Sequence, residues 1–306
     1  MRAVVFAYSN VGDRCLRVLA AQGVEVALVV MHRDHAGEVL WFERVADTAA
    51  ELGMTVAYID DLAGDALTHT VRSAAPDAIF SFYFRSLLPE AVLALAPRGA
   101  YNMHGSLLPH FRGRAPTNWA VLKGATETGA TLHAMTARAD AGGIVDRQSV
   151  PILPDDTARQ VFDKVTVAAE QVLWRALPKI IGGSVRLLPN DIEHGSYYGA
   201  RKPEDGRIDW TRPAQEVYDL VRAVAPPYPG AFTEVGGRRF VVAKARRARG
   251  ASTTERPGLH VLDGRIVGVC GDGGRIDIHE LLEGSNSIAL PISPEALALH
   301  LSENTP

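Results

Sequence analysis

Short apolar runs alternate with amphipathic segments through the first half of the chain, which predicts strands alternating with helices. Residues 2–7 are an apolar, β-branched run, as expected for a strand buried on both faces. An apolar stripe from Cys15 to Leu19 marks the next helix, which Gly23 ends. The same reasoning predicts strands over 24–30, 55–58, 78–82, 100–103, 129–135 and 143–150, and helices over 39–52, 63–74, 117–123 and 157–177. This alternation favours an α/β fold with a doubly wound, mostly parallel sheet.

The pattern changes after about residue 190. Residues 190–209 are polar and rich in turn formers, and they are interpreted as a linker. A helix is predicted over 213–224, and beyond it short apolar runs are separated by glycine pairs, which is typical of a small antiparallel β-barrel. The sequence therefore predicts an N-terminal catalytic domain over 1–189 and a C-terminal OB-like domain over 210–306.

Composition narrows the class of protein without indicating its chemistry. The chain has 306 residues, 47% of them hydrophobic, which is enough for two modest globular domains. A net charge of -3 argues against a general nucleic-acid binder. No apolar stretch approaches membrane-spanning length, and the first residues lack the features of a signal peptide. With only two cysteines, far apart in the sequence, the expectation is a reduced, cytoplasmic protein that does not associate with membranes.

Several common catalytic motifs are absent from the sequence. The first strand and helix lack the glycine fingerprint of dinucleotide-binding folds, and there is no Walker A sequence and no nucleophile elbow. Redox, nucleotide-hydrolysing and serine-hydrolase functions lose their usual support. His32 and His35 have no third ligand nearby in the sequence, so no metal site is predicted.

The most chemically distinctive segment lies at the end of the strand over 100–103. Asn102 and His104 are two residues apart and share one face of that strand, at the sheet edge where α/β folds bind ligands. Asp140 follows a later strand, in a turn. An amide can donate to an oxyanion, an imidazole can move a proton, and a carboxylate can stabilise the imidazolium. These three side chains suit direct acyl transfer to an amine, although the pattern alone equally fits a polar cap on a strand end.

A longer motif surrounds these residues. Residues 102–109 read Asn-Met-His-Gly-Ser-Leu-Leu-Pro, and an Arg-Gly pair at 112–113 and Pro116 follow them. Together with the later Asp140, this series resembles the signature of the folate-dependent formyltransferases. The likeness continues through 152–158 and into the C-terminal domain. The resemblance implies a Rossmann-like catalytic domain and 10-formyltetrahydrofolate as the one-carbon donor, with no metal.

The resemblance also implies roles for individual residues. His104 would transfer the proton, Asn102 would stabilise the oxyanion of the tetrahedral intermediate, and Asp140 would tune His104. The binding site for the folate carrier would comprise Ser86, Leu87, Leu88, Arg114, Thr136, Ala137, Arg138, Ala139 and Asp140.

The sequence constrains the identity of the acceptor amine less than that of the one-carbon donor. Residues 31–44 are short and charge-balanced, whereas formyltransferases that act on initiator tRNA carry a basic insertion there. Within the family the chain most resembles the formyltransferase domain of bifunctional polymyxin-resistance enzymes, which formylate UDP-4-amino-4-deoxy-L-arabinose during lipid A modification. Methionyl-tRNA, a dTDP-4-amino-hexose and a non-catalytic binding module stay open as alternatives. Tyr8, Ser9, Asn10 and Arg201 are the candidate acceptor contacts, the first three from their place at a strand end, where a plain turn fits as well. The partners expected are these small molecules and, as one option, a second copy of the chain.

Overall fold

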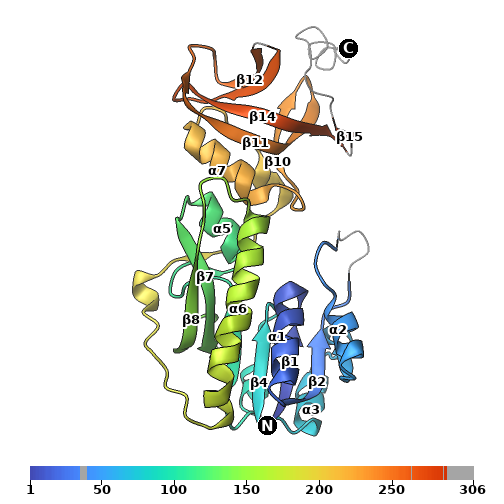
Figure 1. Cartoon of the computed structure of the whole chain (residues 1–306). Coiled ribbons are helices and arrows are strands. Elements are labelled where there is room, and N and C mark those ends of the chain that lie inside the picture. The colour runs from blue at the N-terminus through green and yellow to red at the C-terminus, as the bar shows by residue number, and fades with distance from the viewer. Residues whose placement is uncertain (35–39, 263, 285, 288–306) are drawn as a thin grey trace. The chain divides into compact units, whose positions relative to one another are not determined.

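The computed structural model describes residues 1–34, 40–262, 264–284 and 286–287. These residues form two compact units (Figure 1). Unit 1 comprises residues 1–117, 127–151 and 162–199. Unit 2 comprises residues 118–126, 152–161 and the described residues from 200 onward.

Unit 1 is built on a seven-stranded sheet in the order β3-β2-β1-β4-β5-β7-β8. Five strands are parallel: β1 (Arg2–Ala7), β2 (Glu25–Met31), β3 (Val56–Tyr58), β4 (Ala78–Phe82) and β5 (Ala100–His104). The strands β7 (Glu127–Ala134) and β8 (Ile144–Pro151) run antiparallel to their neighbours. The predicted mostly parallel α/β sheet is therefore confirmed.

Helices cover both faces of this sheet, as the all-buried strands require. Val4 and Phe6 of β1 point into a core shared with α3 (Ala66–Ser73) and α4 (Glu90–Leu93). On the other face, α1 (Ser9–Ala21) buries its apolar stripe and neighbours α2 (Val45–Glu51). Arg14 of α1 forms an ion pair with Glu170 of α6 (Ala158–Ile181), which lies on the same face (Figure 1). The remaining elements of unit 1 are β6 (Arg112–Gly113), β9 (Tyr197–Tyr198), and the short 3-10 helices Ile59–Asp61 and Ile192–His194.

Two predicted helices have different ends in the structure. The helix predicted over 39–52 is observed over 45–51, and its predicted first residue, Val39, lies outside the described residues. Trp41 and Phe42 instead pack as loop residues, with the ring of Trp41 5.4 Å from that of Phe162. The helix predicted to end near residue 177 continues through Pro178 for its last turn, where proline removes only one intrahelical hydrogen bond.

Unit 2 carries an antiparallel sheet in the order β10-β11-β14-β13-β12, with β15 paired to β14. Its strands are β10 (Ala231–Val235), β11 (Arg238–Ser252), β12 (Gly258–Leu262), β13 (Arg265–Val269), β14 (Gly274–Glu283) and β15 (Asn286–Ser287). This curled sheet confirms the prediction of a small barrel-like β domain (Figure 1). The unit also holds α7 (Ala214–Val224), the 3-10 helix Pro203–Gly206 and most of α5 (Pro116–Leu122).

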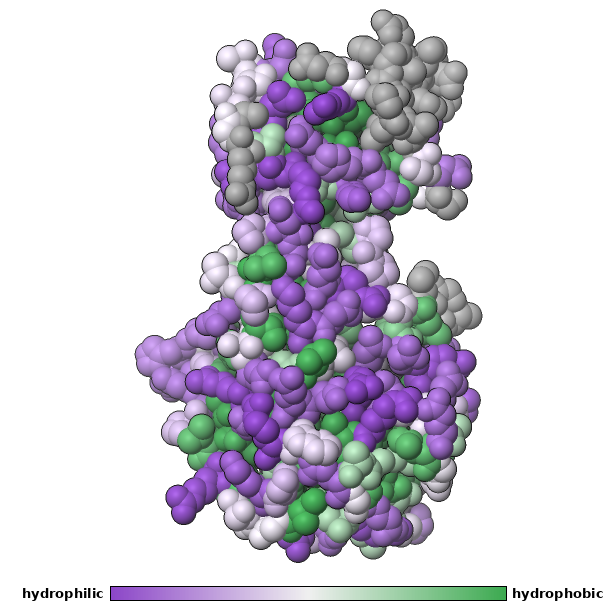
Figure 2. Space-filling view, in the orientation of Figure 1, coloured by the Kyte–Doolittle hydropathy of each residue, from purple (hydrophilic) through white to green (hydrophobic). Residues whose placement is uncertain are grey.

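The surface is mixed in character. On the face shown in Figure 2, hydrophobic side chains are scattered among hydrophilic ones. Leu87 is the most exposed large hydrophobic residue of the described chain, at 77%. Among the helices described, none combines the length and apolarity needed to cross a membrane.

Both cysteines are buried, one in each unit. Cys15 lies in α1 and Cys270 follows β13. Burial raises the pKa of the Cys15 thiol and raises that of Cys270 to about 12. Both thiols therefore stay protonated near neutral pH.

Candidate functional site

The carboxyl end of β5 places Asn102 and His104 on one face, as the alternation of side chains along a strand requires. The neighbouring strand β7 sets their surroundings, because Asn102 lies opposite His133 in the antiparallel register. The side-chain Nδ2 of Asn102 donates a hydrogen bond to Nε2 of His133, at 3.1 Å. Nδ1 of His133 in turn donates to the Ala134 carbonyl at 2.9 Å. This hydrogen bond uses one of the two Nδ2 hydrogens of the Asn102 amide.

Asp140 completes the group from a turn that follows β7. Its Oδ1 lies 3.5 Å from Nδ1 of His104 and 3.5 Å from Nε2 of His133. Its other oxygen, Oδ2, accepts a hydrogen bond of 2.9 Å from the backbone N–H of Gly113. The structure thus brings the three residues singled out from the sequence into one cluster, although Asp140 lies 36 positions beyond His104 in the numbering.

The hydrogen bonds of His104 define which nitrogen can take a proton. Nε2 lies 2.9 Å from the backbone carbonyl of Phe111. Because a carbonyl can only accept, Nε2 carries a hydrogen and Nδ1 holds the free lone pair, facing Asp140. Burial lowers the pKa of His104, and the charge of Asp140 offsets part of that effect. His104 is therefore a neutral imidazole near neutral pH, with a carboxylate placed to stabilise it once protonated.

Asp140 is held as a carboxylate. Burial acts to raise its pKa, but His104, His133 and the Gly113 N–H together hold that pKa well below its usual value. The side chain of Asp140 is only 10% exposed, so solvent screens these interactions weakly. A buried negative charge beside a neutral imidazole favours proton uptake by the imidazole.

His133 belongs to this cluster and was missed by sequence reasoning. It lies in a largely buried strand of mixed composition, where a lone histidine gives no pattern of its own. The one available signal was its alternation with Thr131, which puts both side chains on the same face of β7. Only the register between β5 and β7 shows that this face meets Asn102.

The candidate carrier-binding residues lie in two loops beside this cluster. Ser86 and Leu87 are exposed, whereas the side chain of Leu88 is buried in the core, so only its backbone can contact a ligand. Arg114 donates from Nη2 to the Arg85 carbonyl at 2.6 Å and so braces the loop that precedes Ser86. In the second loop, Thr136, Ala137 and Arg138 are exposed, while Ala139 is half-buried next to Asp140.

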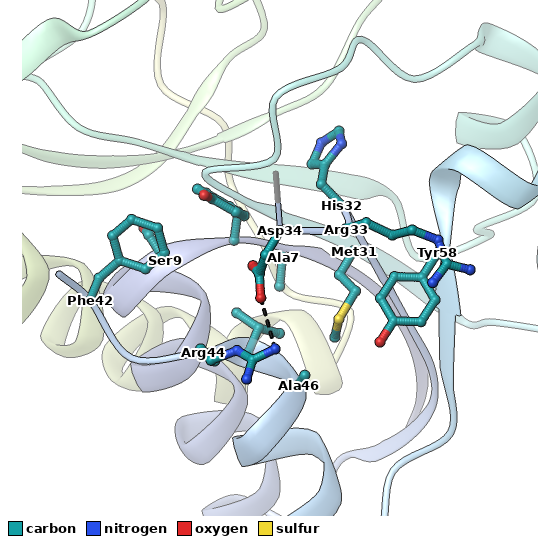
Figure 3. Close-up of a pocket in the computed structure, with 12 residues that line it drawn as sticks. Ala7, Ser9, Met31, His32, Arg33, Asp34, Phe42, Arg44, Ala46 and Tyr58 are labelled. Carbon is teal, nitrogen blue, oxygen red and sulfur yellow. Dashed lines mark ion pairs between the residues drawn. The ribbon is translucent and has the colours of Figure 1, made fainter. Parts of the chain in front are cut away.

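A pocket of about 280 Å³ opens at the carboxyl ends of β1, β2 and β3 (Figure 3). Tyr8 and Ser9 line it, with an ion pair between Asp34 and Arg44 at its mouth. Ser9 is 6% exposed, and its Oγ has no hydrogen-bond partner among the described residues.

The other candidate acceptor residues have defined contacts. The phenolic oxygen of Tyr8 accepts a hydrogen bond from Nη2 of Arg85 at 2.6 Å, and the Arg85 guanidinium lies 3.9 Å from the Tyr8 ring centroid. Oδ1 of Asn10 accepts from the backbone N–H of Glu43 at 2.6 Å. The side-chain oxygens of Tyr8 and Asn10 are therefore already hydrogen-bonded within the protein. The Ser9 hydroxyl, in contrast, has no hydrogen-bond partner among the described residues.

Arg201, the fourth candidate acceptor residue, lies in unit 2. Its guanidinium is half-buried, 5.0 Å from the ring centroid of Trp119, and Nη2 donates to the Asp205 carbonyl at 2.9 Å. Lys123 places its Nζ 5.9 Å from the same indole. Burial lowers the pKa of Arg201, and the charge of Asp205 acts in the opposite direction.

In the part of the chain that the structure describes, no group of three or more His, Cys, Asp or Glu side chains is arranged so that it could hold a metal ion. His32 stacks on Phe84 at 4.3 Å and accepts a hydrogen bond from the Arg85 N–H. His35 lies outside the described residues.

Comparison with known families identifies the protein class. The family model described as "Formyl transferase" matches residues 1–177, and that described as "Formyl transferase, C-terminal domain" matches residues 201–291. The chain belongs to the formyl transferase family. The resemblance noted from its motifs is confirmed at this level, and the protein is a formyltransferase.

Solved structures share the fold of this formyltransferase. An N-formyltransferase from Helicobacter canadensis, solved with folinic acid and dTDP-3-aminofucose, is 16% identical with a TM-score of 0.69, over 90% of this chain and 98% of its own. WlaRD, a sugar 3N-formyl transferase solved with dTDP and 5-N-formyl-THF, is 17% identical with a TM-score of 0.71, over 94% and 98%. A sugar N-formyltransferase from a Shewanella species is 18% identical with a TM-score of 0.61, over 78% and 94%.

Proposed function

We propose that this formyltransferase transfers a formyl group from 10-formyltetrahydrofolate to the primary amine of a sugar nucleotide. The convergence of Asn102, His104 and Asp140 at the end of β5 carries the proposal. The similar structures support the two substrates, since one was solved with folinic acid and dTDP-3-aminofucose and another with dTDP and 5-N-formyl-THF. The proposal assigns no role to a metal.

The geometry suits direct transfer without a covalent enzyme intermediate. The acceptor amine attacks the formyl carbon, and the carbonyl oxygen becomes an oxyanion. The second Nδ2 hydrogen of Asn102 donates to that oxyanion. Nδ1 of His104 takes the proton that the amine loses, directly or through a water, and the bond from the formyl carbon to N10 of the carrier then breaks. Asp140 stabilises the imidazolium, and the proton passes to N10 as the tetrahydrofolate leaves.

The carrier is assigned to the two loops beside the cluster. Ser86, Leu87 and the backbone of Leu88 border one side of the carrier site, and Arg114 and residues 136–140 the other. Leu87 leaves 77% of its surface exposed, so an apolar ring placed against it would bury hydrophobic area. Asp140 belongs to both sets, which places the carried formyl group beside the catalytic cluster.

For the acceptor, we assign Arg201 as a contact to the phosphates. We assign Ser9, in the turn between β1 and α1, as a contact to a sugar or ribose hydroxyl. A half-buried guanidinium whose hydrogen bond goes to a backbone carbonyl keeps donors for an anionic ligand, and Lys123 adds a second cation near Trp119. The Ser9 hydroxyl, buried and without a partner, is placed to accept or donate to a sugar or ribose hydroxyl.

We further propose UDP-4-amino-4-deoxy-L-arabinose as the acceptor, with a role in lipid A modification and polymyxin resistance. The likeness to the bifunctional polymyxin-resistance enzymes supports this choice, and it lies in residues 81–85, 198–205, 222–224 and 228–232. A dTDP-amino-hexose is the nearest competitor, because the similar structures include one solved with such a nucleotide sugar.

A turnover assay separates these acceptors. With 10-formyltetrahydrofolate as donor, we expect product with UDP-4-amino-4-deoxy-L-arabinose at a kcat/KM at least tenfold above that with dTDP-amino-hexoses, and none with initiator methionyl-tRNA. Tight binding of the tRNA that weakens steeply with salt would contradict the proposal. Binding of both small molecules without any product would instead indicate a non-catalytic module.

Replacing Arg201 with alanine should raise the KM for the sugar nucleotide by about 10- to 100-fold, because a charge-assisted hydrogen bond to phosphate contributes about 1.5–3 kcal/mol. The KM for the folate donor and kcat should change little. Arg212→Ala is the matched control, since the Arg212 side chain is exposed and forms an ion pair with Glu216 of α7. An unchanged KM in the Arg201 variant would remove this residue from the acceptor site.

A further inference from the structure

The backbone of residues 109–114 holds both His104 and Asp140 in place. The Phe111 carbonyl accepts the Nε2 hydrogen bond of His104, and the Gly113 N–H donates to Asp140. Neither contact involves a side chain of that segment. The orientation of the two residues proposed for proton transfer therefore depends on the path of the backbone here.

This path is conformationally unfavourable on its own. Phe111 has a φ of 55° and Asp140 has a φ of 51°. Both values lie in the left-handed region of backbone conformation, which residues other than glycine rarely adopt. Such backbone is unfavourable by itself and persists only where the surroundings enforce it. Asp140 belongs to the cluster and the Phe111 carbonyl contacts it, so the enforcing contacts affect its geometry directly.

Those contacts come from residues 190–198, which we name the clasp and which lie in unit 1. Strand β9 of the clasp pairs with β6 in parallel, aligning Tyr197 with Arg112. Ser196 accepts from the Phe111 N–H through its Oγ at 2.8 Å, and its own N–H donates to the Pro109 carbonyl at 3.2 Å. The clasp thus fixes the residue whose carbonyl holds His104.

The other end of the clasp fastens the turn that carries Asp140. The Nδ2 group of Asn190 donates to the backbone carbonyls of Asp140 and Gly142, at 3.0 Å each. One continuous segment therefore supports both residues that contact the His104 imidazole, Phe111 at Nε2 and Asp140 at Nδ1.

The fit leaves no room for a side chain at its closest point. A Cβ added to Gly195 would lie 2.2 Å from the Pro109 carbonyl oxygen, which is backbone and cannot rotate away. Gly195 itself has no unusual backbone conformation, so an alanine there would act through this contact alone. By contrast, a Cβ added to Gly199, the residue after the clasp, would have no heavy atom of the described residues within 4 Å.

We infer that the clasp is a positioning device for the formyl-transfer site, through which Asn190, Gly195 and Ser196 set the geometry of His104 and Asp140 without touching substrate. This inference rests on the roles proposed for His104 and Asp140. The clasp acts through the Phe111 carbonyl and the turn at Asp140, and it presents no group of its own to the reacting atoms.

The titration of His104 offers a readout that a purely structural role would not change. The groups that act on its imidazole are Asp140, the Phe111 carbonyl, His133 and Arg112. Asp140 and the Phe111 carbonyl favour the protonated form, whereas burial and the other two disfavour it. Releasing the clasp loosens the two favourable contacts, so the pKa of His104 should fall further below its ordinary value.

Three variants test the clasp. Ser196→Ala and Asn190→Ala should each lower kcat about three- to tenfold, and Gly195→Ala about 10- to 100-fold, with KM values for both substrates nearly unchanged. In each variant the imidazole of His104, followed by NMR in the full-length enzyme, should titrate at lower pH than in the wild type. Ser196→Thr, which keeps the acceptor oxygen, should restore part of both properties.

Gly199→Ala is the matched control and should behave as wild type. If Gly195→Ala fails to fold, Ser196→Ala and Asn190→Ala decide the question alone. Wild-type kcat and wild-type His104 titration in folded variants would overturn the clasp as a positioning device. A changed titration in an enzyme whose His104→Ala variant keeps full turnover would instead show that the clasp orients His104 while the proposed catalytic role is wrong.

Discussion

Replacing His104 with alanine should lower kcat for formyl transfer by about 10²- to 10⁴-fold, because the variant has no group at this position to take the proton from the attacking amine. The protein should keep its fold and its affinity for the folate donor, since the polar contacts of the imidazole with the described residues are those to the Phe111 carbonyl and to Asp140. Steady-state kinetics with both substrates, together with thermal unfolding, provides the measurement.

The pH dependence of the wild-type enzyme is a second test of His104 as the group that takes the proton. His104 acts as a base only when neutral, and burial lowers its pKa. We therefore expect kcat/KM to rise with pH and to level off at a pH below the ordinary histidine pKa. His110→Ala is the control, because that side chain is exposed on the following loop. Undiminished turnover in His104→Ala would exclude the residue as the base.

Replacing Asn102 with alanine should lower kcat by roughly 10²- to 10³-fold, through loss of the donor aimed at the oxyanion. The effect should appear in kcat more than in KM, since the interaction forms only as charge develops on the formyl oxygen. Asn102→Asp should be at least as impaired, because a carboxylate keeps the shape but cannot donate.

Asn102→Ala also removes a hydrogen bond to His133, whose Nε2 accepts from the Asn102 amide. A His133→Phe substitution removes that acceptor, together with the 3.5 Å contact between His133 and Asp140, and should cost less than tenfold. Equal losses in Asn102→Ala and His133→Phe would mean that Asn102 acts by orienting its neighbour and not by contacting the oxyanion.

The elements of unit 1 were predictable from sequence where one local pattern decides them. The strand at 78–82 is observed at the predicted residues, because five consecutive buried positions admit few alternatives. The helix predicted from residue 39 was too long, because its leading apolar residues serve tertiary packing: Phe42 contacts the ring of Tyr8 at 5.1 Å. Hydrophobic periodicity cannot distinguish an apolar residue on a helix from one in a packed loop.

The residues of the cluster likewise divide into those that a local sequence pattern predicts and those that it does not. Asn102 and His104 share a face because they are two residues apart in a strand, which the sequence alone determines. Their approach to Asp140 was expected from the family resemblance, and no local pattern encodes it. His133 and the clasp depend on strand register and on backbone contacts between segments over 80 residues apart, such as Phe111 with Ser196. Contacts of that kind carry no sequence pattern that a single chain reveals.

The burial of both native cysteines has a practical consequence for measuring ligand binding. Cys15 and Cys270 are the only two thiols of the chain, and each is inaccessible and protonated at neutral pH. Maleimide dyes, which need an accessible thiolate, will leave them unlabelled. A cysteine introduced at the exposed Ser86 can then carry a single fluorophore, whose emission reports occupancy of the neighbouring loop in real time and without catalysis.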